Sequence, residues 1–482
     1  MKLANQLPLT VICELANLPR GSHSLVNHLT QAMRQAILDG KLPGGTLLPG
    51  TRILAEACGI GRSSIVEVID QLAMEGYLET RQGAPTRVAA IDDAVASRKL
   101  LAPKSPVTSN VWILDDPPSP VTTRAFRPGL PELRNFPKQE WATLIAKRCR
   151  QPISHDLSYA NLCGLMGLRE ALLVHLRQTR GVLARPEQLI VVPSAQAAFA
   201  ILTQACLESG DVAWVEDPGY PGIRSVLRSK RIQMVNRPVD TGGLVVKEPG
   251  PLRPKLIYTT PSHQYPTGVT MPLQRRLELL DYAHNVGAIV IEDECDSDYQ
   301  YQGRAIASLQ GLDPHGCVAY VGTFSKTLAP GLRMAYLVVP PHLAALVETV
   351  ATVSGYAVPT HLQLAMTDFL SGGGFQKHLR RVTTEAGARI TTLERELRRA
   401  QEPRLTVPIP EGGLQLCVRW SGQTPDTEIA SRLLTRDVYV LPLSSLCHAC
   451  PQPGFVMGVG LVQKEEIPSA VERFVKTLGE CA

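Results

Sequence analysis

The chain has 482 residues, of which 44% are hydrophobic and 19% are charged, and its formal net charge at pH 7 is +5. This length exceeds what one hydrophobic core usually serves, so we expect more than one domain, and the composition excludes a largely disordered chain. No apolar run is long enough to span a membrane, and the N-terminus lacks the basic-then-apolar layout of a signal peptide, which predicts a cytoplasmic protein.

The 11 cysteines are an odd number scattered through apolar stretches. This pattern favours reduced thiols over a disulfide framework. Cys447 and Cys450, in the stretch CHAC, have the spacing of metal ligands. A structural zinc needs four ligands and the sequence has no second such pair, so we expect no metal there.

Three predicted helices open the chain. Residues 24–39 place apolar side chains on one helical face and end at Gly40; these are Leu25, Leu29, Ala32, Ala36 and Ile37. Two shorter helices, at about Thr51 to Ala57 and Ser63 to Met74, are separated by a tight turn at Gly59. This spacing predicts a helix-turn-helix, and the following YLETRQGAPTRV predicts two short strands around a tip, which form a wing.

The stretch from Gly40 to Val88, GKLPGGTLLPGTRILAEACGIGRSSIVEVIDQLAMEGYLETRQGAPTRV, resembles the GntR-type winged helix over nearly its whole length. The resemblance implies that DNA is contacted by the arginine after the LP turn, the start of the recognition helix and the wing glycine. These positions are Arg52, Arg62, Ser63, Ser64 and Gly83.

Charge alone does not indicate nucleic-acid binding, because residues 1–90 carry eight Lys or Arg against seven Asp or Glu. A single arginine is usually a solvated surface charge, but the joint position of Arg52 and Arg62 in a winged helix favours DNA contact. Gly50 and Gly61 stand where the family often has hydroxyl residues. We therefore expect a side-chain helix cap or a phosphate hydrogen bond to be missing.

From about Ala89 to Arg124 the sequence is rich in Pro, Ser, Asp and Ala without sustained periodicity, which predicts a linker. A flexible segment of this length spans on the order of 30 to 35 Å. We therefore expect a DNA-binding domain at 20–90, a linker at 91–124 and a second domain at 125–482.

The second domain is predicted to be α/β with a mostly parallel sheet, because short apolar runs alternate with helical segments. The runs are LIVVP, VAWVE, KLIYTT, AIVIED, VAYVGTF and AYLVVP. A long amphipathic helix at 375–400 and strands near LQLCVRW, VYVLP and FVMGVG follow, then a final helix. We expect a large part at about 150–370 and a smaller α+β part at about 371–482.

Lys326 ends the stretch GTFSK directly after a predicted strand, behind hydroxyl groups at Thr323 and Ser325. A single lysine in this position is usually an exposed charge or a phosphate contact. Three further elements favour a cofactor site. Asp293 ends the AIVIED strand, where a carboxylate could face a pyridine nitrogen, and Tyr220 in EDPGYPG could stack on a ring. The third is the PSHQYPTG loop at 261–268, which looks like the turn that walls the cofactor in fold-type I enzymes.

The segment from FRPGLPEL at 126 onward resembles the aminotransferase-like half of the MocR-type regulators, which fuse a GntR winged helix to a fold-type I pyridoxal-phosphate domain. With the N-terminal domain included, the resemblance covers almost the whole chain. It implies that Lys326 forms a Schiff base with pyridoxal 5′-phosphate, that Asp293 pairs with the pyridine nitrogen and that Tyr220 stacks on the ring. It also implies phosphate contacts from Ala195, Gln196, Thr323 and Arg333. Tyr159 resembles the tyrosine that reaches the phosphate from the neighbouring subunit, which implies a homodimer.

Several positions depart from the family pattern. Cys295, in EDECDSDY, stands where a tyrosine usually donates to the cofactor, and Tyr265 or Tyr299 could compensate. Pro193 removes one backbone amide from the phosphate loop. Gly222 stands where some relatives have an arginine, and residues 441–472 contain no arginine for a substrate carboxylate. Bidentate recognition of a carboxylate is therefore not expected.

These patterns predict a transcription regulator that binds a double-stranded DNA operator. It would sense an amine or amino-acid effector, or pyridoxal phosphate itself, through an aldimine at Lys326. One alternative is an active aminotransferase with a fused DNA-binding domain, which the missing arginine disfavours. The other is a cofactor-free repressor whose large domain only dimerises, which the retention of Lys326, Asp293 and Arg333 disfavours.

Overall fold

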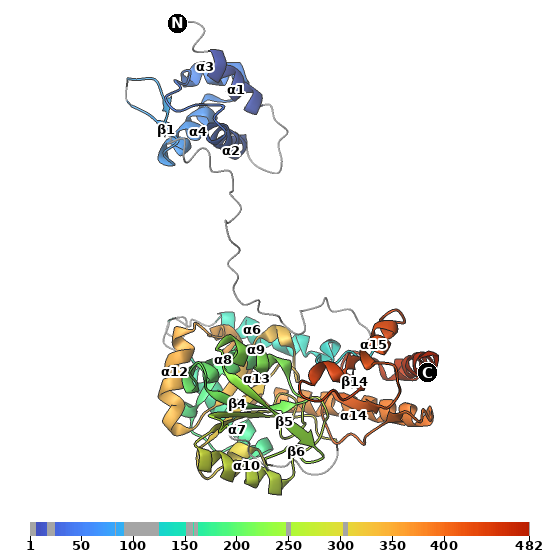
Figure 1. The fold of residues 1–482 in the computed structure, drawn as a ribbon. Helices are drawn as coiled ribbons and strands as arrows, with labels where there is room; N and C mark the ends of the chain where they lie inside the picture. Colours follow the sequence, from blue (N-terminus) through green and yellow to red (C-terminus); the bar gives the residue numbers. More distant parts are fainter. Residues whose placement is uncertain are drawn as a thin grey trace. The chain divides into compact units, whose positions relative to one another are not determined.

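The computed structural model describes residues 6–16, 25–81, 83–90, 125–150, 158, 162–246, 252–301 and 307–481. The chain divides into two compact units, Met1–Val111 and Trp112–Ala482 (Figure 1). The predicted linker at 91–124 lies outside the described residues, and each unit is considered by itself.

The first unit is a winged helix. It contains α1 (Gln6–Ala16), α2 (Leu25–Leu38), α3 (Thr51–Cys58), α4 (Arg62–Met74) and the antiparallel pair β1 (Leu78–Glu79) and β2 (Arg87–Val88). Apolar side chains at helical spacing on α2 and α4, among them Leu29, Ile37 and Leu72, form its core. Gly59 ends α3 in the left-handed conformation that glycine readily adopts. The predicted helix-turn-helix is confirmed to within one or two residues, whereas α1 is an additional helix.

An eight-stranded sheet forms the centre of the second unit, in the order β3-β10-β9-β8-β7-β4-β5-β6. The pairs from β9 to β5 are parallel, whereas β10 is antiparallel to both its neighbours and β6 is antiparallel to β5. The bounds are β3 Leu189–Val192, β4 Val212–Asp217, β5 Gln233–Asp240, β6 Gly243–Leu244, β7 Leu256–Thr259, β8 Ile289–Asp293, β9 Val318–Thr323 and β10 Ala335–Val338. The predicted, mostly parallel sheet is confirmed.

Helices cover both faces of this sheet, which is why its central strands β7, β8 and β9 read as largely apolar runs. Side chains alternate between two cores: Ala319 and Val321 of β9 pack on one face, and Tyr320 packs on the other. The helices are α6 (Lys138–Arg150), α7 (Met166–Arg180), α8 (Ala195–Cys206), α9 (Pro221–Ser229), α10 (Leu273–Val286), α11 (Leu309–Leu312), α12 (Ala344–Val353) and α13 (Thr360–Ser371).

A smaller α+β part completes the second unit. Its antiparallel sheet has the order β11-β12-β14-β13 and packs with α14, α15 and α16. The buried Phe126 belongs to this small core. The small part therefore contains residues from near the start of the second unit as well as its C-terminal residues. The bounds are α14 Gly374–Arg399, β11 Leu405–Thr406, β12 Gln415–Trp420, α15 Asp426–Leu434, β13 Leu441–Pro442, β14 Gly454–Gly458 and α16 Ile467–Glu480.

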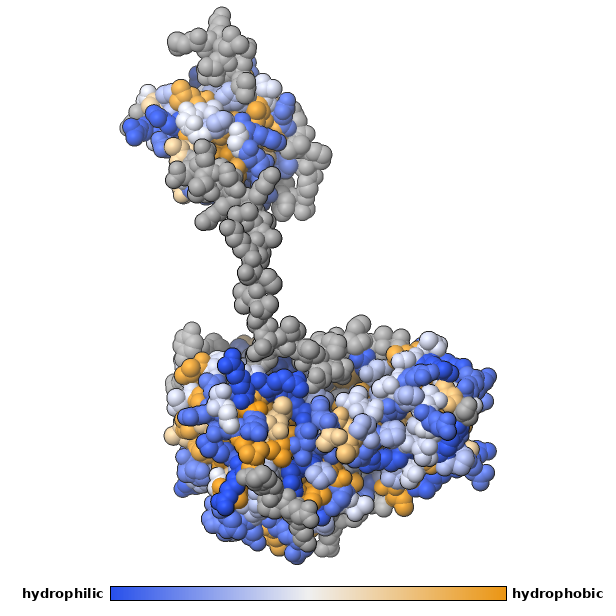
Figure 2. Space-filling view, viewed as in Figure 1, coloured by the Kyte–Doolittle hydropathy of each residue, from blue (hydrophilic) through white to orange (hydrophobic). Residues whose placement is uncertain are grey.

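The visible face of the second unit carries hydrophilic residues with apolar ones among them (Figure 2). Within the described ranges, no helix is both long and apolar enough to cross a membrane.

Candidate functional site

Lys326 lies three residues after the end of β9, at the carboxyl end of this inner strand of the sheet. Its Nζ donates to the backbone oxygen of Gly129 at 2.5 Å. The Tyr299 hydroxyl donates to the backbone oxygen of Lys326 at 2.8 Å, so the lysine backbone is fixed from a second direction. A primary amine is thereby presented from a rigid strand end.

Asp293 ends β8 and accepts two hydrogen bonds of 2.5 Å. The Tyr258 hydroxyl donates to Oδ2 and the Cys295 thiol donates to Oδ1. Burial raises the pKa of Asp293 to about 6, although both hydrogen bonds oppose this rise. Cys295 therefore bonds to the carboxylate that the sequence predicted to face the pyridine nitrogen.

Tyr220 immediately precedes α9 and is held by neighbours on two sides. The Gln196 side-chain amide donates to its hydroxyl at 3.3 Å, and the Tyr265 ring meets it edge-on with centroids 5.6 Å apart. A Cβ atom at Gly222 would overlap both Gln196 and the Tyr220 ring. The absence of a side chain at residue 222 is therefore what permits this arrangement.

The N-terminus of α8 offers an anion-binding position. Ser194 caps the helix by accepting from the Ala197 amide at 3.1 Å, although Pro193 precedes it. The amides of the first helical turn have no partner inside the helix and favour a negative charge. Nearby, Thr323 Oγ1 donates to Ser325 Oγ at 3.0 Å.

One cavity of about 230 Å³ brings these groups together. Of the predicted cofactor residues, it gathers Lys326, Asp293, Tyr220, Ala195, Gln196, Thr323 and Arg333. Tyr159, the remaining one, lies outside the described residues. The cavity is also lined by Gly129, Ser194, Thr260, His263, Tyr265, Cys295, Asp296, Ser325, Leu414 and Gln415. Tyr265 thus lies in the cavity, whereas the Tyr299 hydroxyl is bonded to the Lys326 backbone.

Sequence reasoning missed Tyr258 and Glu216, two buried residues that support the site through hydrogen bonds. Glu216 is fully buried in β4 and accepts from Thr259, Thr260 and Gln264, which joins the EDPGYPG and PSHQYPTG stretches. Burial raises the pKa of Glu216, and these hydrogen bonds oppose the rise. The available signal for Tyr258 was a tyrosine inside the apolar run of KLIYTT.

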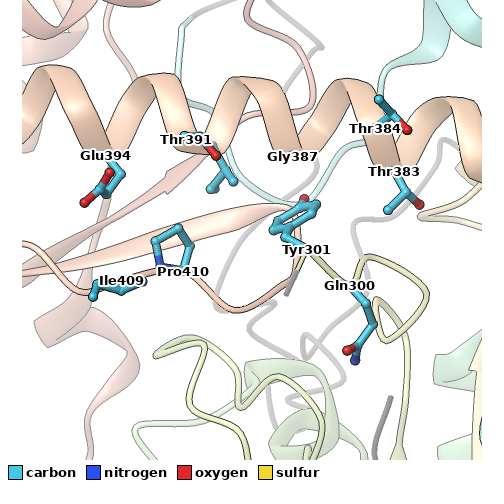
Figure 3. A pocket seen from close by; sticks show the side chains of 10 residues that line it. Gln300, Tyr301, Thr383, Thr384, Gly387, Thr391, Glu394, Ile409 and Pro410 are labelled. Atoms are coloured by element: carbon cyan, nitrogen blue, oxygen red, sulfur yellow. The ribbon is translucent and has the colours of Figure 1, made fainter. Parts of the chain in front are cut away.

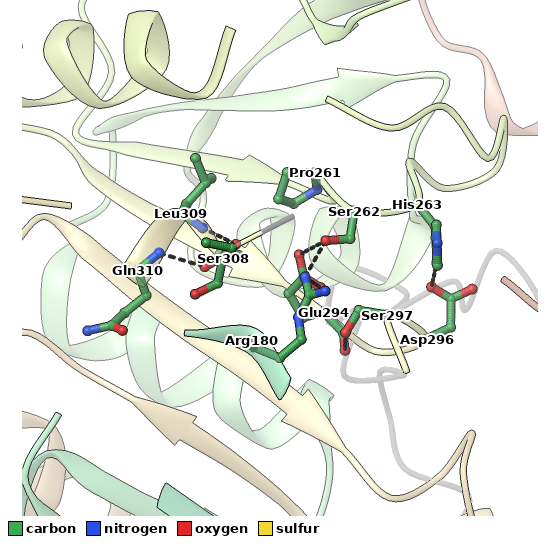
Figure 4. A network of polar contacts seen from close by, with 12 residues as sticks. Arg180, Pro261, Ser262, His263, Glu294, Asp296, Ser297, Ser308, Leu309 and Gln310 are labelled. Carbon is green, nitrogen blue, oxygen red and sulfur yellow. Dashed lines mark hydrogen bonds and ion pairs between the residues drawn. The ribbon is translucent and has the colours of Figure 1, made fainter. Parts of the chain in front are cut away.

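The residues on either side of Asp293 point to the opposite face of the sheet, because side chains alternate along a strand. Glu294 pairs with Arg180 at 2.7 Å and accepts from Ser262 at 2.6 Å (Figure 4). Glu292 accepts from the amides of Leu309 and Gln310. Burial and the nearby Glu294 carboxylate raise the pKa of Glu292 to about 8. This network anchors the strand end that carries Asp293.

The CHAC loop contacts the EDPGYPG stretch. The backbone amides of His448 and Ala449 donate to the Asp217 carboxylate at 2.8 and 2.7 Å. Among the described residues, no group of three or more His, Cys, Asp or Glu side chains is arranged to hold a metal ion. The two hydrogen bonds to Asp217 give the loop a structural partner in the fold.

A second cavity, of about 450 Å³, runs along α14 and contains none of the predicted site residues (Figure 3). Threonine side chains and Glu394 line its helical side, and Tyr301, Ile409 and Pro410 lie opposite. Most of its lining comes from the small part of the second unit, and Gln300 and Tyr301 come from the segment after β8.

In the first unit, the predicted DNA-contacting residues are all at least partly accessible. Arg52, Arg62, Ser63 and Gly83 are exposed and Ser64 is half-buried. Gly83 adopts a left-handed backbone, with φ at 79°, at the tip of the wing. Gly50 and Gly61 stand at the N-caps of α3 and α4 without a side-chain cap, which confirms the predicted loss.

Comparisons with known proteins match both units. Residues 25–88 match the family "Bacterial regulatory proteins, gntR family", and residues 135–473 match "Aminotransferase class I and II". The probable rhizopine catabolism regulatory protein MocR of Rhizobium meliloti is 36% identical over 437 residues, 89% of each chain. The pyridoxine biosynthesis regulator PdxR of Corynebacterium glutamicum is 31% identical over 76% of this chain and 77% of that protein.

The second unit also has the fold of solved aminotransferases. The kynurenine aminotransferase of Pyrococcus horikoshii superposes with a TM-score of 0.70 at 24% identity, covering 75% of this chain and 92% of that one. The fold and the site thus define a transcription regulator whose second unit is built like a fold-type I aminotransferase. The chain belongs to the MocR-type regulators of the GntR superfamily.

Proposed function

We propose that the chain is a pyridoxal-phosphate-dependent transcription regulator whose grip on operator DNA changes when an amine reaches the cofactor. The observation that carries this proposal is the single cavity that combines a lysine amine, a buried carboxylate, a helix N-terminus and an arginine. These groups match the aldehyde, the pyridine nitrogen and the phosphate of the cofactor. When bound, pyridoxal phosphate supplies an aldehyde that condenses with primary amines and a ring that withdraws electrons.

Each residue of the cavity is proposed to bind the group of the cofactor that suits its chemistry. Lys326 would carry it covalently through Nζ, and Asp293, held by Tyr258 and Cys295, would keep a proton on the ring nitrogen. Tyr220 would cover one face of the ring.

The phosphate would lie at the N-terminus of α8, where the amides of Ala195 and Gln196 favour a negative charge. Thr323 and Arg333 would add a hydroxyl and a guanidinium. Tyr159 of a second subunit would complete this end of the site in a homodimer.

Sensing is better supported than turnover. Among the described residues that line the cavity, Arg333 is the one arginine. We assign its guanidinium to the cofactor phosphate, so it is not available for a substrate carboxylate. At Gly222 a side chain would overlap Gln196 and Tyr220, so no guanidinium enters from there. Efficient transamination needs a firm grip on the substrate to orient the reacting bond. We therefore assign the cavity to sensing. The effector proposed for it is an amine or amino acid, or the cofactor itself.

The partners follow from the two units. The winged helix would bind a double-stranded operator in the cytoplasm, with Arg52 and the start of α4 toward the groove. The name of the related PdxR connects that protein with pyridoxine biosynthesis, and the name of MocR connects that protein with rhizopine catabolism. Both names support a small-molecule signal for this chain.

The test uses the full chain loaded with pyridoxal phosphate. A panel of primary amines is titrated while the visible absorption and the affinity for DNA from upstream of the chain's own coding sequence are recorded. We expect an effective amine to shift the absorption and to change the DNA affinity at least fivefold, whereas Lys326→Ala should show neither response.

A loaded protein that responds to no amine would contradict the effector half of the proposal. Sustained formation of keto acid at ordinary enzymic rates would instead favour an aminotransferase.

A further inference from the structure

Two cysteines of the first unit lie sulfur to sulfur. Cys13 of α1 and Cys58, the last residue of α3, have their Sγ atoms 2.8 Å apart. They are 45 residues apart in the chain, and both are free and partly exposed. We propose that Cys13 and Cys58 are a modification site, a dithiol that low-molecular-weight disulfides oxidise to a reversible bond locking α1 onto the helix-turn-helix. This goes beyond the proposed function and does not depend on the cofactor.

The geometry requires little movement. A disulfide has an S–S distance of about 2.05 Å, so the two sulfur atoms need to approach by less than about 1 Å. Both residues are partly exposed, so neither is sealed in the core of the first unit. The two sulfur atoms are therefore close enough for a bond to form with a small movement of the side chains.

The position of α1 gives the bond its effect. This helix lies outside residues 25–88, which match the regulator family, and it packs on the core through Ile12 and Ala16. A helix of 11 residues is marginal by itself in water, so its place depends on these contacts. A covalent link would suppress local detachment of α1.

Cys58 also lies close to the DNA-reading surface. Gly59 follows it, and α4 begins at Arg62. At the other end of α3, Arg62 Nε donates to Thr51 Oγ1 at 3.4 Å, so α3 contacts α1 at one end and the recognition helix at the other. Fixing α1 to α3 therefore stabilises the arrangement that presents α4.

The chemistry balances as two successive exchanges. Burial and the adjacent Cys13 raise the pKa of Cys58 to about 12, which makes Cys58 a poor first nucleophile, and the exchange is written with Cys13 attacking first. The Cys13 thiolate attacks the reagent disulfide and releases one small thiol. The Cys58 thiolate then attacks the Cys13 sulfur, forms the protein disulfide and releases the second small thiol. Two protein thiols are oxidised, and one reagent disulfide is reduced.

The test uses the full chain, freed of reductant and incubated with oxidised glutathione. Mass spectrometry of the unreduced digest should find a peptide joining Cys13 to Cys58. Hydrogen–deuterium exchange should slow at least about tenfold at the amides of α1 and α3 and stay unchanged in the second unit. Dithiothreitol should reverse both effects, and DNA binding should stay within about threefold.

Cys13→Ser and Cys58→Ser should each abolish the cross-link and the slowed exchange. Cys450→Ser, which removes an exposed thiol of the second unit, should leave both. Glutathione adducts without the Cys13–Cys58 peptide would overturn the inference. So would a cross-link that leaves exchange unchanged or accelerates it, or one that abolishes DNA binding.

Discussion

The Cys295 thiol donates its hydrogen to Oδ1 of Asp293 across 2.5 Å, while Tyr258 donates to the other oxygen. The carboxylate proposed to face the cofactor is thus oriented from both sides before any ligand arrives. A preorganised partner of this kind needs no rearrangement when it meets a developing charge.

Asp293→Asn should weaken pyridoxal phosphate binding on the order of 100-fold, because a buried charge pair with the ring would lose one partner. Titration of the cofactor-free protein by absorbance measures this directly. Asp281→Asn changes an exposed carboxylate of the same unit and should bind normally. Equal affinity in the two variants would contradict the role of Asp293.

The cofactor-free protein should lose stability as the pH rises between about 4 and 6.5. The pKa of Asp293 is raised to about 6 in the fold, above the usual carboxyl value, so the folded state holds this proton longer than the unfolded state. The loss amounts to roughly 2 kcal/mol. Thermal midpoints of wild type and Asp293→Asn across this range isolate the effect, since the variant lacks this titration. Parallel curves would contradict it.

Gly222→Ala should lower both stability and cofactor affinity, because the new methyl group displaces Gln196 and the Tyr220 ring. Overpacking of this kind costs about 1–3 kcal/mol. Gly479→Ala is the matched control, since nothing lies within 4 Å of a Cβ atom there. Thermal unfolding midpoints are measured by calorimetry. If both variants unfold at the wild-type temperature, a side chain at residue 222 does not collide with Gln196 and Tyr220.

Arg180 and Glu294 should behave as a coupled pair. Their side chains are 2% and 0% exposed, so Arg180→Met leaves a buried carboxylate unpaired and should destabilise the second unit by about 3–5 kcal/mol. The double variant Arg180→Met with Glu294→Met should recover most of this loss. A double-mutant cycle of denaturant unfolding measures the coupling, and additive losses would show that the two side chains act independently.

Arg62→Ala should weaken operator binding by about 1–3 kcal/mol if the side chain reads a base, or lower the salt slope by about 1 if it contacts a phosphate. Fluorescence anisotropy at several salt concentrations distinguishes these outcomes. Arg399→Ala removes an arginine of the second unit whose side chain is 82% exposed, and should change neither quantity. An Arg62 variant that binds as the wild type does would remove this residue from the interface.

The sequence by itself determined where the elements lie. The helical spacing of α2 and α4 and the apolar runs of β4, β8 and β9 are local patterns, so the ends of these elements follow from neighbouring residues. Lys326 and Asp293 were found in the same way, because Asp293 ends such a run and Lys326 closely follows one.

Only the tertiary structure decided the partners of these residues. Tyr258 meets Asp293 because β7 lies beside β8 in a particular register, and Cys13 meets Cys58 because α1 packs on α3. The same holds for the antiparallel placement of β10 and for Phe126 in the small core. Such contacts join residues that are distant in the chain, and packing of the whole fold selects them rather than any local pattern.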